Sequence, residues 1–379
     1  MIKNLSQISE KILKEAGNKK VFLLVSGGVD STVLFVLLNK VLGSERVLGL
    51  HVDHGLMRLN ESRQIMDFLQ KEGINNLQIC DASEEFLTAL QGVAEPEKKR
   101  NIIGEVFLKV ASREMQRLSL STSEWMLAQG TIYPDIIESG NIKNTDTIKT
   151  HHNRVQGVLD LQEKGMLLEP LASLYKNEVR ILGEELGIPR ELVWRHPFPG
   201  PGLGVRLLCC DGKPVGNEPK FLPIKSVGIK NNARTYGQPL LIEGDLPWEE
   251  LEKQSVDNRA VWLVERAANE AFEAVEQYCA KETLDTLRLF DDICLKFLQE
   301  NDLYNKIWQM PVVLLPLKTA GKPCIVIRPV NSIDAMTASF AKIDQGLLKN
   351  SLWPKLKAAG LGALFYDITN KPPATIEWE

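Results

Sequence analysis

The chain has 379 residues, of which 44% are hydrophobic and 25% are charged, and its formal net charge is −4. A chain of this length can form two or three domains with separate cores, and it contains no apolar run of about 18 residues that would cross a membrane. Because the net charge is slightly negative, the sequence has no overall positive field for DNA or RNA, and we expect no nucleic-acid partner.

The N-terminal residues 1–17 mix lysine and glutamate in an amphipathic helical pattern. This pattern differs from the basic and then apolar layout of a signal peptide, so we expect a mature cytoplasmic protein. The cysteines are scattered without C-x-x-C spacing, which favours ordinary thiols over a zinc site or a disulfide framework. They are Cys80, Cys209, Cys210, Cys279, Cys294 and Cys324.

Short β-branched runs alternate with helical patterns in the first third of the chain. We predict strands at Val21–Val25, Val47–Val52 and Leu77–Ile79, with helices at Ser31–Leu42 and Glu61–Glu72 between them. This β-α-β-α-β order predicts an α/β fold with a parallel sheet covered by helices on both faces. Ligands of such sheets bind at the carboxyl ends of the strands, where the loops after Val25 and Val52 lie.

A glycine-rich segment joins the first predicted strand to the first predicted helix. Its residues are Ser26, Gly27, Gly28, Val29, Asp30 and Ser31. Glycines let the backbone approach an anion closely, the helix N-terminus adds partial positive charge, and the serines offer hydroxyl donors. A carboxylate at Asp30 would repel bare phosphate, so it predicts a Mg²⁺ ion that bridges it to pyrophosphate. The plainer alternative is a turn capped by serine and aspartate at a helix start.

The cluster His196–Gly202 contains four prolines and glycines in succession after Phe198 and predicts a domain joint. Beyond it, Leu222–Gly228 and Leu315–Gly321 resemble each other, which predicts two copies of one α+β unit, the second entered through a helix at Leu284–Asn301. Chance similarity between short segments is the alternative. The predicted domains are residues 1–205, 206–283 and 284–379.

The glycine-rich segment is not the G-x-x-x-x-G-K-[ST] loop that delivers a terminal phosphoryl group. It resembles the loop of the N-type ATP pyrophosphatases, and within them the chain is most similar to the synthetase portion of the GMP synthetases. The resemblance covers nearly the whole chain. It rests on the blocks His51–Arg58, Glu97–Gly104, Leu127–Asp135, Ile148–Asn153, Glu169–Leu171, Arg195–Leu203 and Lys371–Glu379.

This resemblance implies a Rossmann-like domain of the adenine-nucleotide α-hydrolase type, followed by the longer, duplicated form of an α+β dimerisation domain. It implies ATP-dependent amination of XMP to GMP through an adenylyl intermediate, with ATP and Mg²⁺, and a homodimer. Asp30 and Lys176 are the expected catalytic groups, Lys176 by contact with pyrophosphate. Read from the residues alone, Lys176 is a solvated helix lysine.

Further nucleotide contacts follow from the same resemblance. Gln129, Gly130 and Thr131 are expected beside the adenosine. Asp135 and Glu138 are carboxylates that could help hold magnesium, although charges at a helix start are the commoner interpretation. The expected XMP-binding residues are Arg100, Pro199, Gly200, Pro201, Gly202, Asn232, Gln309, Lys371, Thr375 and Glu377.

For three segments of the chain, the residues alone favour another interpretation than the family resemblance does. Lys98, Lys99 and Arg100 form a polar run typical of an exposed, solvated loop, whereas the family has a mobile lid there. The C-terminal residues are typical of a frayed tail, whereas the resemblance implies that they are folded against the rest of the protein. His151 and His152 are adjacent in sequence, so they do not predict a pair of metal ligands. Their two possible roles are substrate contact and structural hydrogen bonding.

The sequence also departs from the family. Asn232 stands where an aspartate is expected, so an acceptor-site charge is missing. No cysteine has glycines on both sides within two positions, as a glutaminase nucleophile would, so we expect ammonia from solution or from a separate glutamine amidotransferase subunit. Two alternatives remain: the same chemistry on another substrate, such as a tRNA base or a nicotinate dinucleotide, and a non-catalytic paralogue that acts as a regulatory or assembly subunit.

Overall fold

The computed structural model describes residues 5–121, 123–133, 166–216, 218–231, 233–254, 259–332 and 336–379. The chain divides into two compact units. Unit 1 comprises Met1–Phe86 and Gly104–Arg195, and unit 2 comprises Leu87–Ile103 and His196–Glu379. The larger segment of unit 2 thus begins at the proline- and glycine-rich cluster that the sequence indicated as a joint. The boundaries at 205 and 283 stay predictions.

Unit 1 is built on a five-stranded parallel sheet with the order β3-β2-β1-β4-β5. The predicted strands and helices of the first third are confirmed to within a few residues. The strands are β1 (Lys20–Leu24), β2 (Val47–Asp53), β3 (Leu77–Asp81), β4 (Trp125–Ala128) and β5 (Leu167–Leu168). The helices are α1 (Leu5–Ala16), α2 (Val29–Leu42), η1 (Ser44–Arg46), α3 (Glu61–Lys71), α4 (Ser83–Ala89), α5 (Pro96–Arg117), α8 (Lys176–Glu185) and α9 (Arg190–Val193).

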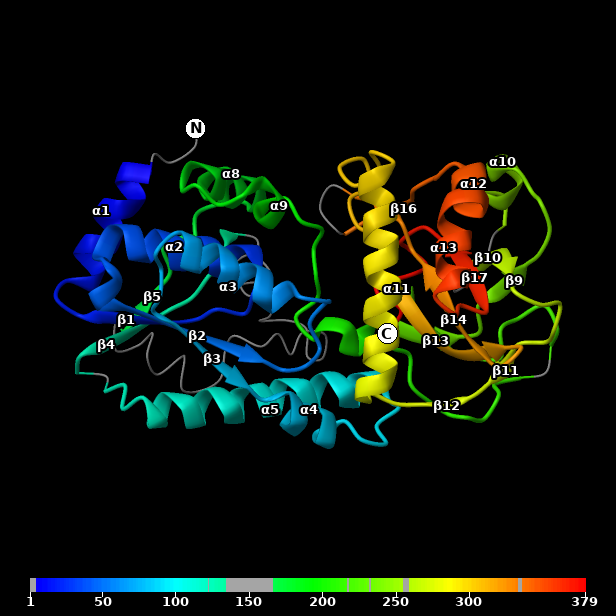
Figure 1. Ribbon diagram of the computed structural model, residues 1–379, viewed down its shortest axis with the longest axis horizontal. Helices are drawn as coiled ribbons and strands as arrows, with labels where there is room; N and C mark the ends of the chain where they lie inside the picture. Colours follow the sequence, from blue (N-terminus) through cyan, green and yellow to red (C-terminus); the bar gives the residue numbers. More distant parts are fainter. Residues whose placement is uncertain are drawn as a thin grey trace. The chain divides into compact units, whose positions relative to one another are not determined.

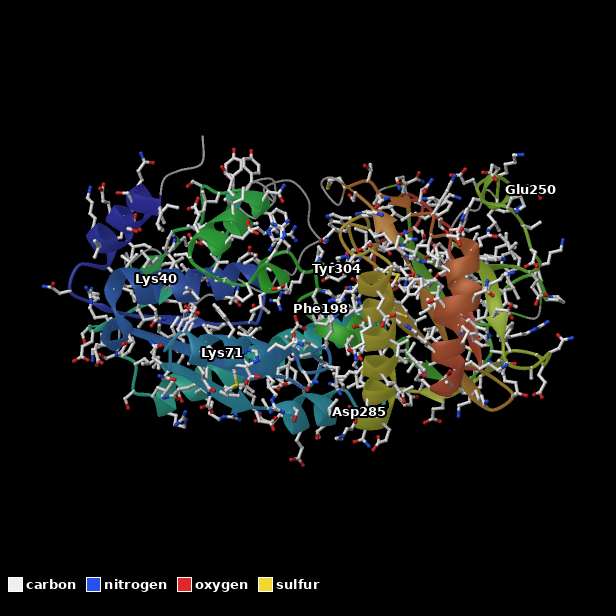
Figure 2. All side chains as sticks on the ribbon, turned by 45° about the horizontal axis from the view of Figure 1, so that its top comes forward. Lys40, Lys71, Phe198, Glu250, Asp285 and Tyr304 are labelled. Carbon is white, nitrogen blue, oxygen red and sulfur yellow. The ribbon has the colours of Figure 1, made fainter. Side chains whose placement is uncertain are left out.

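Helix α2 is the centre of the unit 1 core. Its residues 33–38 are all buried, because α1, α3, α8 and α9 pack around it on one face of the sheet. The Gly104–Arg117 part of α5 covers the other face (Figure 1). Near the end of α2, Lys40, labelled in Figure 2, donates a hydrogen bond of 2.6 Å to the carbonyl of Leu186 after α8. This packing fixes the direction of α2, and therefore the position of its N-terminus.

Unit 2 contains a six-stranded mixed sheet with the order β11-β13-β14-β17-β10-β9. Its strands are β9 (Leu240–Ile242), β10 (Ala260–Arg266), β11 (Glu273–Ala274), β13 (Val312–Thr319), β14 (Lys322–Ile327) and β17 (Ala363–Asp367). Smaller pairs are β6 (Cys210–Asp211) with β12 (Glu276–Gln277), β7 (Ser226–Lys230) with β8 (Ala233–Gly237), and β15 (Val330–Asn331) with β16 (Ser339–Phe340). The two predicted repeats therefore share one large sheet, and their origin from a copied unit stays a prediction.

The longest helix of unit 2 is α11 (Lys281–Glu300), which confirms the helix predicted at Leu284–Asn301. It lies beside α13 (Trp353–Ala358) and against the sheet (Figure 1). The shorter helices are η3 (Gly202–Val205), α10 (Trp248–Leu251), α12 (Gln345–Leu347) and the π-helical turn η4 (Leu348–Leu352). Trp378, from the end of the chain, packs in one core cluster with Val313 of β13 and Phe365 of β17.

None of the helices in the described ranges has both the length and the apolar composition that a membrane crossing requires.

Candidate functional site

The loop between β1 and α2 turns sharply at Gly27. Its φ is +84°, a left-handed value that favours glycine, and a Cβ there would lie 3.1 Å from Cε of Met57. Gly28 is extended and precedes the first helical residue, Val29. The loop follows the carboxyl end of β1, the edge where parallel sheets bind ligands. The left-handed conformation is thus the reason for glycine at position 27, because the end of the flexible Met57 side chain could move away from a Cβ.

The N-terminus of α2 presents donors at this loop. The first backbone bond of the helix runs from Thr32 N to Gly28 O at 3.1 Å, so the N–H groups of Val29, Asp30 and Ser31 belong to the turn that has no acceptor within the helix. Together with the helix dipole, such groups form a ready anion site. The hydroxyls of Ser26 and Ser31 lie 3.1 Å apart, and Ser26 Oγ lies 3.3 Å from Gly28 N. The structure therefore brings the predicted phosphate-binding residues together.

Asp30 and Lys176 meet at the start of α2. Lys176 Nζ donates to Asp30 Oδ2 at 2.6 Å, and Asp30 Oδ1 is buried without a hydrogen-bond partner among the described residues. A carboxylate oxygen left in this state suits a hard cation such as Mg²⁺, which prefers oxygen ligands and usually keeps phosphate and water in its shell. Within the described ranges, no group of three or more metal-binding side chains occurs. Asp30 Oδ1 is therefore a candidate ligand for such a cation at this loop.

The loop after β4 contacts the same helix start. Thr131 Oγ1 donates to Glu169 Oε1 at 2.6 Å, and Gln129 N donates to Leu168 O at 3.0 Å. A Cβ on Gly130 would lie 3.2 Å from Ser31 N and 3.3 Å from Asp30 C. A side chain at this position would therefore force the two loops apart by a few tenths of an ångström. Adenosine binding by this loop stays a prediction.

Replacing Gly130 with alanine should push the β4 loop away from the first turn of α2. Because the atoms in the way are backbone, the strain cannot be relieved by rotating a side chain, and we expect a cost of about 1–3 kcal/mol in stability. Because this shift would displace the backbone N–H donors in the first turn of α2, we expect the KM for ATP to rise about ten-fold or more. Steady-state kinetics and thermal unfolding of the variant check both effects. An unchanged KM for ATP would show that the contact is not needed for nucleotide binding.

The polar run at 98–100 is not an exposed loop, which corrects the interpretation from the residues alone. It lies in the first turns of α5, and the Lys99 side chain is fully buried. Lys99 Nζ forms an ion pair with Glu379 and donates to the carbonyls of Gly204 and Leu207 at 2.9 and 2.8 Å. Burial by itself lowers the pKa of Lys99, but the Glu379 carboxylate outweighs it and holds the pKa above the ordinary value.

The C-terminal tail is tucked into unit 2 rather than frayed. Arg206 donates to both carboxylate oxygens of Glu377, at 3.1 and 2.9 Å. Gln309 Nε2 lies 3.4 Å from Glu377 Oε1 and donates to Pro197 O at 2.9 Å. Arg100 donates to Glu379 O and, at 2.7 Å, to Glu97. Four of the predicted XMP residues, Arg100, Gln309, Thr375 and Glu377, therefore belong to or contact one folded tail.

The structure also describes two other parts of the predicted acceptor site, the Pro199–Gly202 turn and Lys371. Pro199, Gly200, Pro201 and Gly202 form a turn closed by a 2.9 Å bond from Gly202 N to Pro199 O, with Gly202 at φ +61°. Just before the turn, His196 stacks on Tyr304, which Figure 2 labels, with ring centroids 4.1 Å apart. Lys371 pairs through its backbone with Ala338. Asn232, Asp135, Glu138, His151 and His152 lie outside the described residues, as does the Ile148–Asn153 block.

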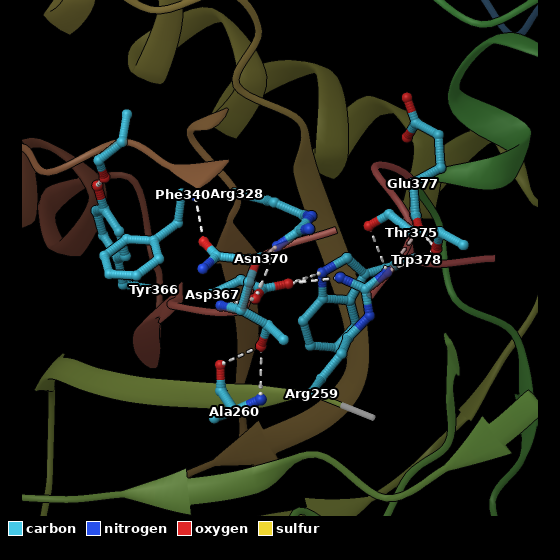
Figure 3. A network of polar contacts seen from close by, with 12 residues as sticks. Arg259, Ala260, Arg328, Phe340, Tyr366, Asp367, Asn370, Thr375, Glu377 and Trp378 are labelled. Carbon is cyan, nitrogen blue, oxygen red and sulfur yellow. Dashed lines mark hydrogen bonds and ion pairs between the residues drawn. The ribbon is translucent and has the colours of Figure 1, made fainter. Parts of the chain in front are cut away.

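The sequence did not reveal the buried charge network that anchors the tail (Figure 3). Asp367 lies between two fully buried arginines, 2.6 Å from Arg259 and 2.8 Å from Arg328, and accepts a 2.9 Å bond from Trp378 Nε1. Burial alone would raise the pKa of Asp367, but the two guanidinium groups outweigh it and hold the pKa below 3.8. Arg259 also donates to the carbonyl oxygens of Thr375 and Glu377 at 2.9 and 2.7 Å.

Known families match both ends of the chain. Residues 296–378 match the model described as GMP synthase C terminal domain, and residues 1–144 match the model described as NAD synthase. A protein of Leptospira interrogans named as a probable glutamine-hydrolyzing GMP synthase is 41% identical over 99% of this chain and 66% of its own length. The chain belongs to the GMP synthase family. The glutamine-hydrolyzing GMP synthase of Bdellovibrio bacteriovorus is 37% identical over 98% of this chain and 62% of its own length.

These GMP synthases are longer than the chain, which spans 66% of the first and 62% of the second. A solved NMN synthetase from Francisella tularensis is 15% identical, with a TM-score of 0.38 over 53% of this chain and 78% of its own. That likeness is too slight to add to the assignment. Membership of the GMP synthase family therefore rests on the sequence match along nearly the whole chain.

Proposed function

We propose that the chain catalyses the ATP-dependent amination of XMP to GMP, with release of AMP and pyrophosphate. The observation that carries the proposal is the Asp30 carboxylate in the first turn of α2, with one oxygen on Lys176 and the other without a hydrogen-bond partner among the described residues. A carboxylate beside an anion-binding helix start is useful if the ligand is a metal–pyrophosphate complex. Membership of the GMP synthase family supports the same reaction.

In this reaction the residues of the Ser26–Ser31 loop bind the two outer phosphates of ATP. The xanthine O2 of XMP attacks the α-phosphorus, and the bond to pyrophosphate breaks. Ammonia then attacks C2 of the adenylated base and AMP leaves, so that each GMP is accompanied by one AMP and one pyrophosphate. Mg²⁺ held at Asp30 would neutralise charge on the leaving pyrophosphate.

The protein's own groups contribute mainly by positioning and by charge. The N–H groups of Val29, Asp30 and Ser31 are aligned before the ligand arrives, so little reorganisation is needed. The Lys176 ammonium, whose side chain is 40% exposed, adds a positive charge at the same place. This division explains why no dedicated nucleophile is needed, because the two substrates supply both attacking atoms.

The acceptor nucleotide is proposed to contact the folded tail of unit 2. Arg100 supplies a guanidinium that matches a phosphate in shape and charge, and Lys371 supplies an ammonium. Thr375 and Glu377 lie in a segment whose main chain is held by Arg259, which supports a prebuilt site. Asn232 and the Pro199–Gly202 turn keep their proposed acceptor roles.

Ammonia is proposed to come from solution or from a separate glutamine amidotransferase subunit. A homodimer and a cytoplasmic location remain part of the proposal.

The test mixes the chain with ATP, XMP, Mg²⁺ and ammonium and follows AMP, GMP and pyrophosphate. We expect the three products in equal amounts, with no turnover when XMP is omitted. A parallel reaction with glutamine in place of ammonium separates the two nitrogen sources. If ADP is formed instead of AMP, or if ATP and XMP bind without reaction, the proposed activity is wrong.

A further inference from the structure

Two backbone carbonyls of the nucleotide loop region are held by side chains from other parts of unit 1. His51 Nδ1 lies 2.7 Å from the carbonyl oxygen of Val25, the residue after β1. Arg195 donates an N–H to the carbonyl oxygen of Gly27. A carbonyl only accepts, so His51 must carry its proton on Nδ1. Both contacts draw oxygen atoms of the loop toward donors.

Both of these side chains are in turn held by the first turn of α3. Arg195 donates from its other terminal nitrogen, Nη1, to Glu61 Oε1 at 2.7 Å, and His51 Nε2 lies 3.0 Å from Ser62 Oγ. The exposed fractions of the Arg195 and Glu61 side chains are only 13% and 9%. An ion pair sheltered in this way is less screened by water and salt than a surface pair. Neighbouring residues of one helix therefore support both contacts.

The contact of Arg195 with the Gly27 carbonyl also fixes the direction of the Gly28 N–H, because both groups lie in one peptide plane. The carbonyl of Gly27 and the N–H of Gly28 belong to one planar trans peptide and point in opposite directions. When the carbonyl is fixed on Arg195, the N–H is fixed on the other side, where it lies 3.3 Å from Ser26 Oγ. With glycine on both sides, no Cβ restrains this peptide from turning over. A flipped peptide would direct an oxygen at the bound anion.

We propose that Arg195 is a positioning residue that orients the Gly27–Gly28 peptide for pyrophosphate binding, with Glu61 holding its guanidinium in place. The His51–Ser62 pair does the same for the Val25 carbonyl. This inference deepens the proposed function and rests on it, because it takes the loop as the ATP pyrophosphate site. Arg195 thus affects ATP binding indirectly, by orienting the backbone that contacts the pyrophosphate.

The experiment compares Arg195→Met, Arg195→Lys and Glu61→Gln in the full chain, with Arg63→Met as the matched control. Arg63 is on the same helix and its side chain is 80% exposed. The measurements are the KM for ATP, the KM for XMP, and the binding of inorganic pyrophosphate with Mg²⁺ by calorimetry. We expect Arg195→Met to weaken pyrophosphate binding and raise the KM for ATP about ten- to a hundred-fold, with the KM for XMP unchanged.

Arg195→Lys should recover part of the loss, because an ammonium can donate to one partner but cannot bridge two as a guanidinium does. Glu61→Gln should act in the same direction with a smaller effect, and the double variant should be no worse than Arg195→Met alone. If Arg195→Met does not fold, Glu61→Gln alone carries the comparison. Arg63→Met should match the parent protein in every measurement.

The inference is overturned if Arg195→Met binds pyrophosphate as the parent does, or if its KM values for ATP and XMP rise equally. Failure of the proposed function looks different. In that case the parent protein makes no AMP from ATP and XMP, and the pyrophosphate titrations still decide whether Arg195 orients the loop. A parent protein that binds no pyrophosphate at all overturns the inference as well.

Discussion

Replacing Asp30 with asparagine should reduce XMP-dependent AMP formation by about a hundred- to a thousand-fold, the scale reported for losing one preorganised electrostatic contact. The amide keeps the shape of the side chain but removes the charge that would hold Mg²⁺. It also leaves Lys176 without the carboxylate that lies 2.6 Å from its ammonium. The loss should appear in kcat/KM for ATP, and raising the Mg²⁺ concentration should recover part of it.

A matched control for this variant is Asp67→Asn on α3, because that side chain is 57% exposed and forms only a 4.0 Å pair with Arg63. It should leave turnover unchanged. Lys176→Met should lower the rate without changing the Mg²⁺ requirement, since it removes a charge and no metal ligand. Undiminished turnover of Asp30→Asn at low Mg²⁺ would remove the metal from the site and, with it, the main support for the ATP pyrophosphatase assignment.

The β1–α2 loop could be predicted from the sequence, because the residues that indicate it are neighbours in the chain. Val21–Val25 is an uninterrupted apolar run, as expected for a strand buried on both faces. The glycines and Ser31 follow it directly, so the strand, the loop and the helix start are all contained in one short stretch. The contact between Lys176 and Asp30 could not be derived in this way, because the two residues are 146 positions apart. The loop itself predicted Asp30 at a metal–pyrophosphate complex, whereas only the family resemblance predicted Lys176 there.

The candidate acceptor site was harder to predict, because the folding of the C-terminal tail depends on residues that are distant in the sequence. Lys99 looks solvated in sequence, since lysine and arginine flank it, yet the carboxylate that permits its burial is the last residue of the chain. A lone charge in a polar run carries no sign of such a partner. Arg259 and Asp367 give a usable signal, because Arg259 directly precedes the apolar strand β10 and Asp367 is the last residue of the apolar strand β17. A charge at the edge of a buried strand must be paired.

The sheet of unit 2 was also beyond local patterns. Its central strand pair, β14 with β17, is parallel, while β17 with β10 is antiparallel, and β10 comes from a segment about a hundred residues earlier. The similarity of Leu222–Gly228 to Leu315–Gly321 suggested separate units, but only the second segment provides a strand of the large sheet. The first leads into the β7–β8 hairpin. Strand order in a mixed sheet is set by long-range packing rather than by short motifs.

Asp367→Ala should strongly destabilise unit 2. It would leave two fully buried guanidinium groups without the carboxylate between them, and removing one partner of a buried ion pair costs about 3–5 kcal/mol. For a unit of this size, we expect the melting temperature to fall by on the order of 10 °C. Asp245→Ala is the control, since its side chain is 85% exposed. Calorimetry of the full chain measures both.

The dependence on pH distinguishes lost charge from lost packing. Because the folded pKa of Asp367 is below 3.8, the stability it contributes is fully present above pH 3.8 and is lost as the pH falls through the lowered value. The difference in unfolding free energy between the parent and Asp367→Asn should therefore shrink below pH 3.8. Arg259 also holds the main chain of Thr375 and Glu377, so Asp367→Asn should raise the KM for XMP while the KM for ATP stays constant. A loss that is equal for both substrates would mean that the network stabilises the protein without shaping the acceptor site.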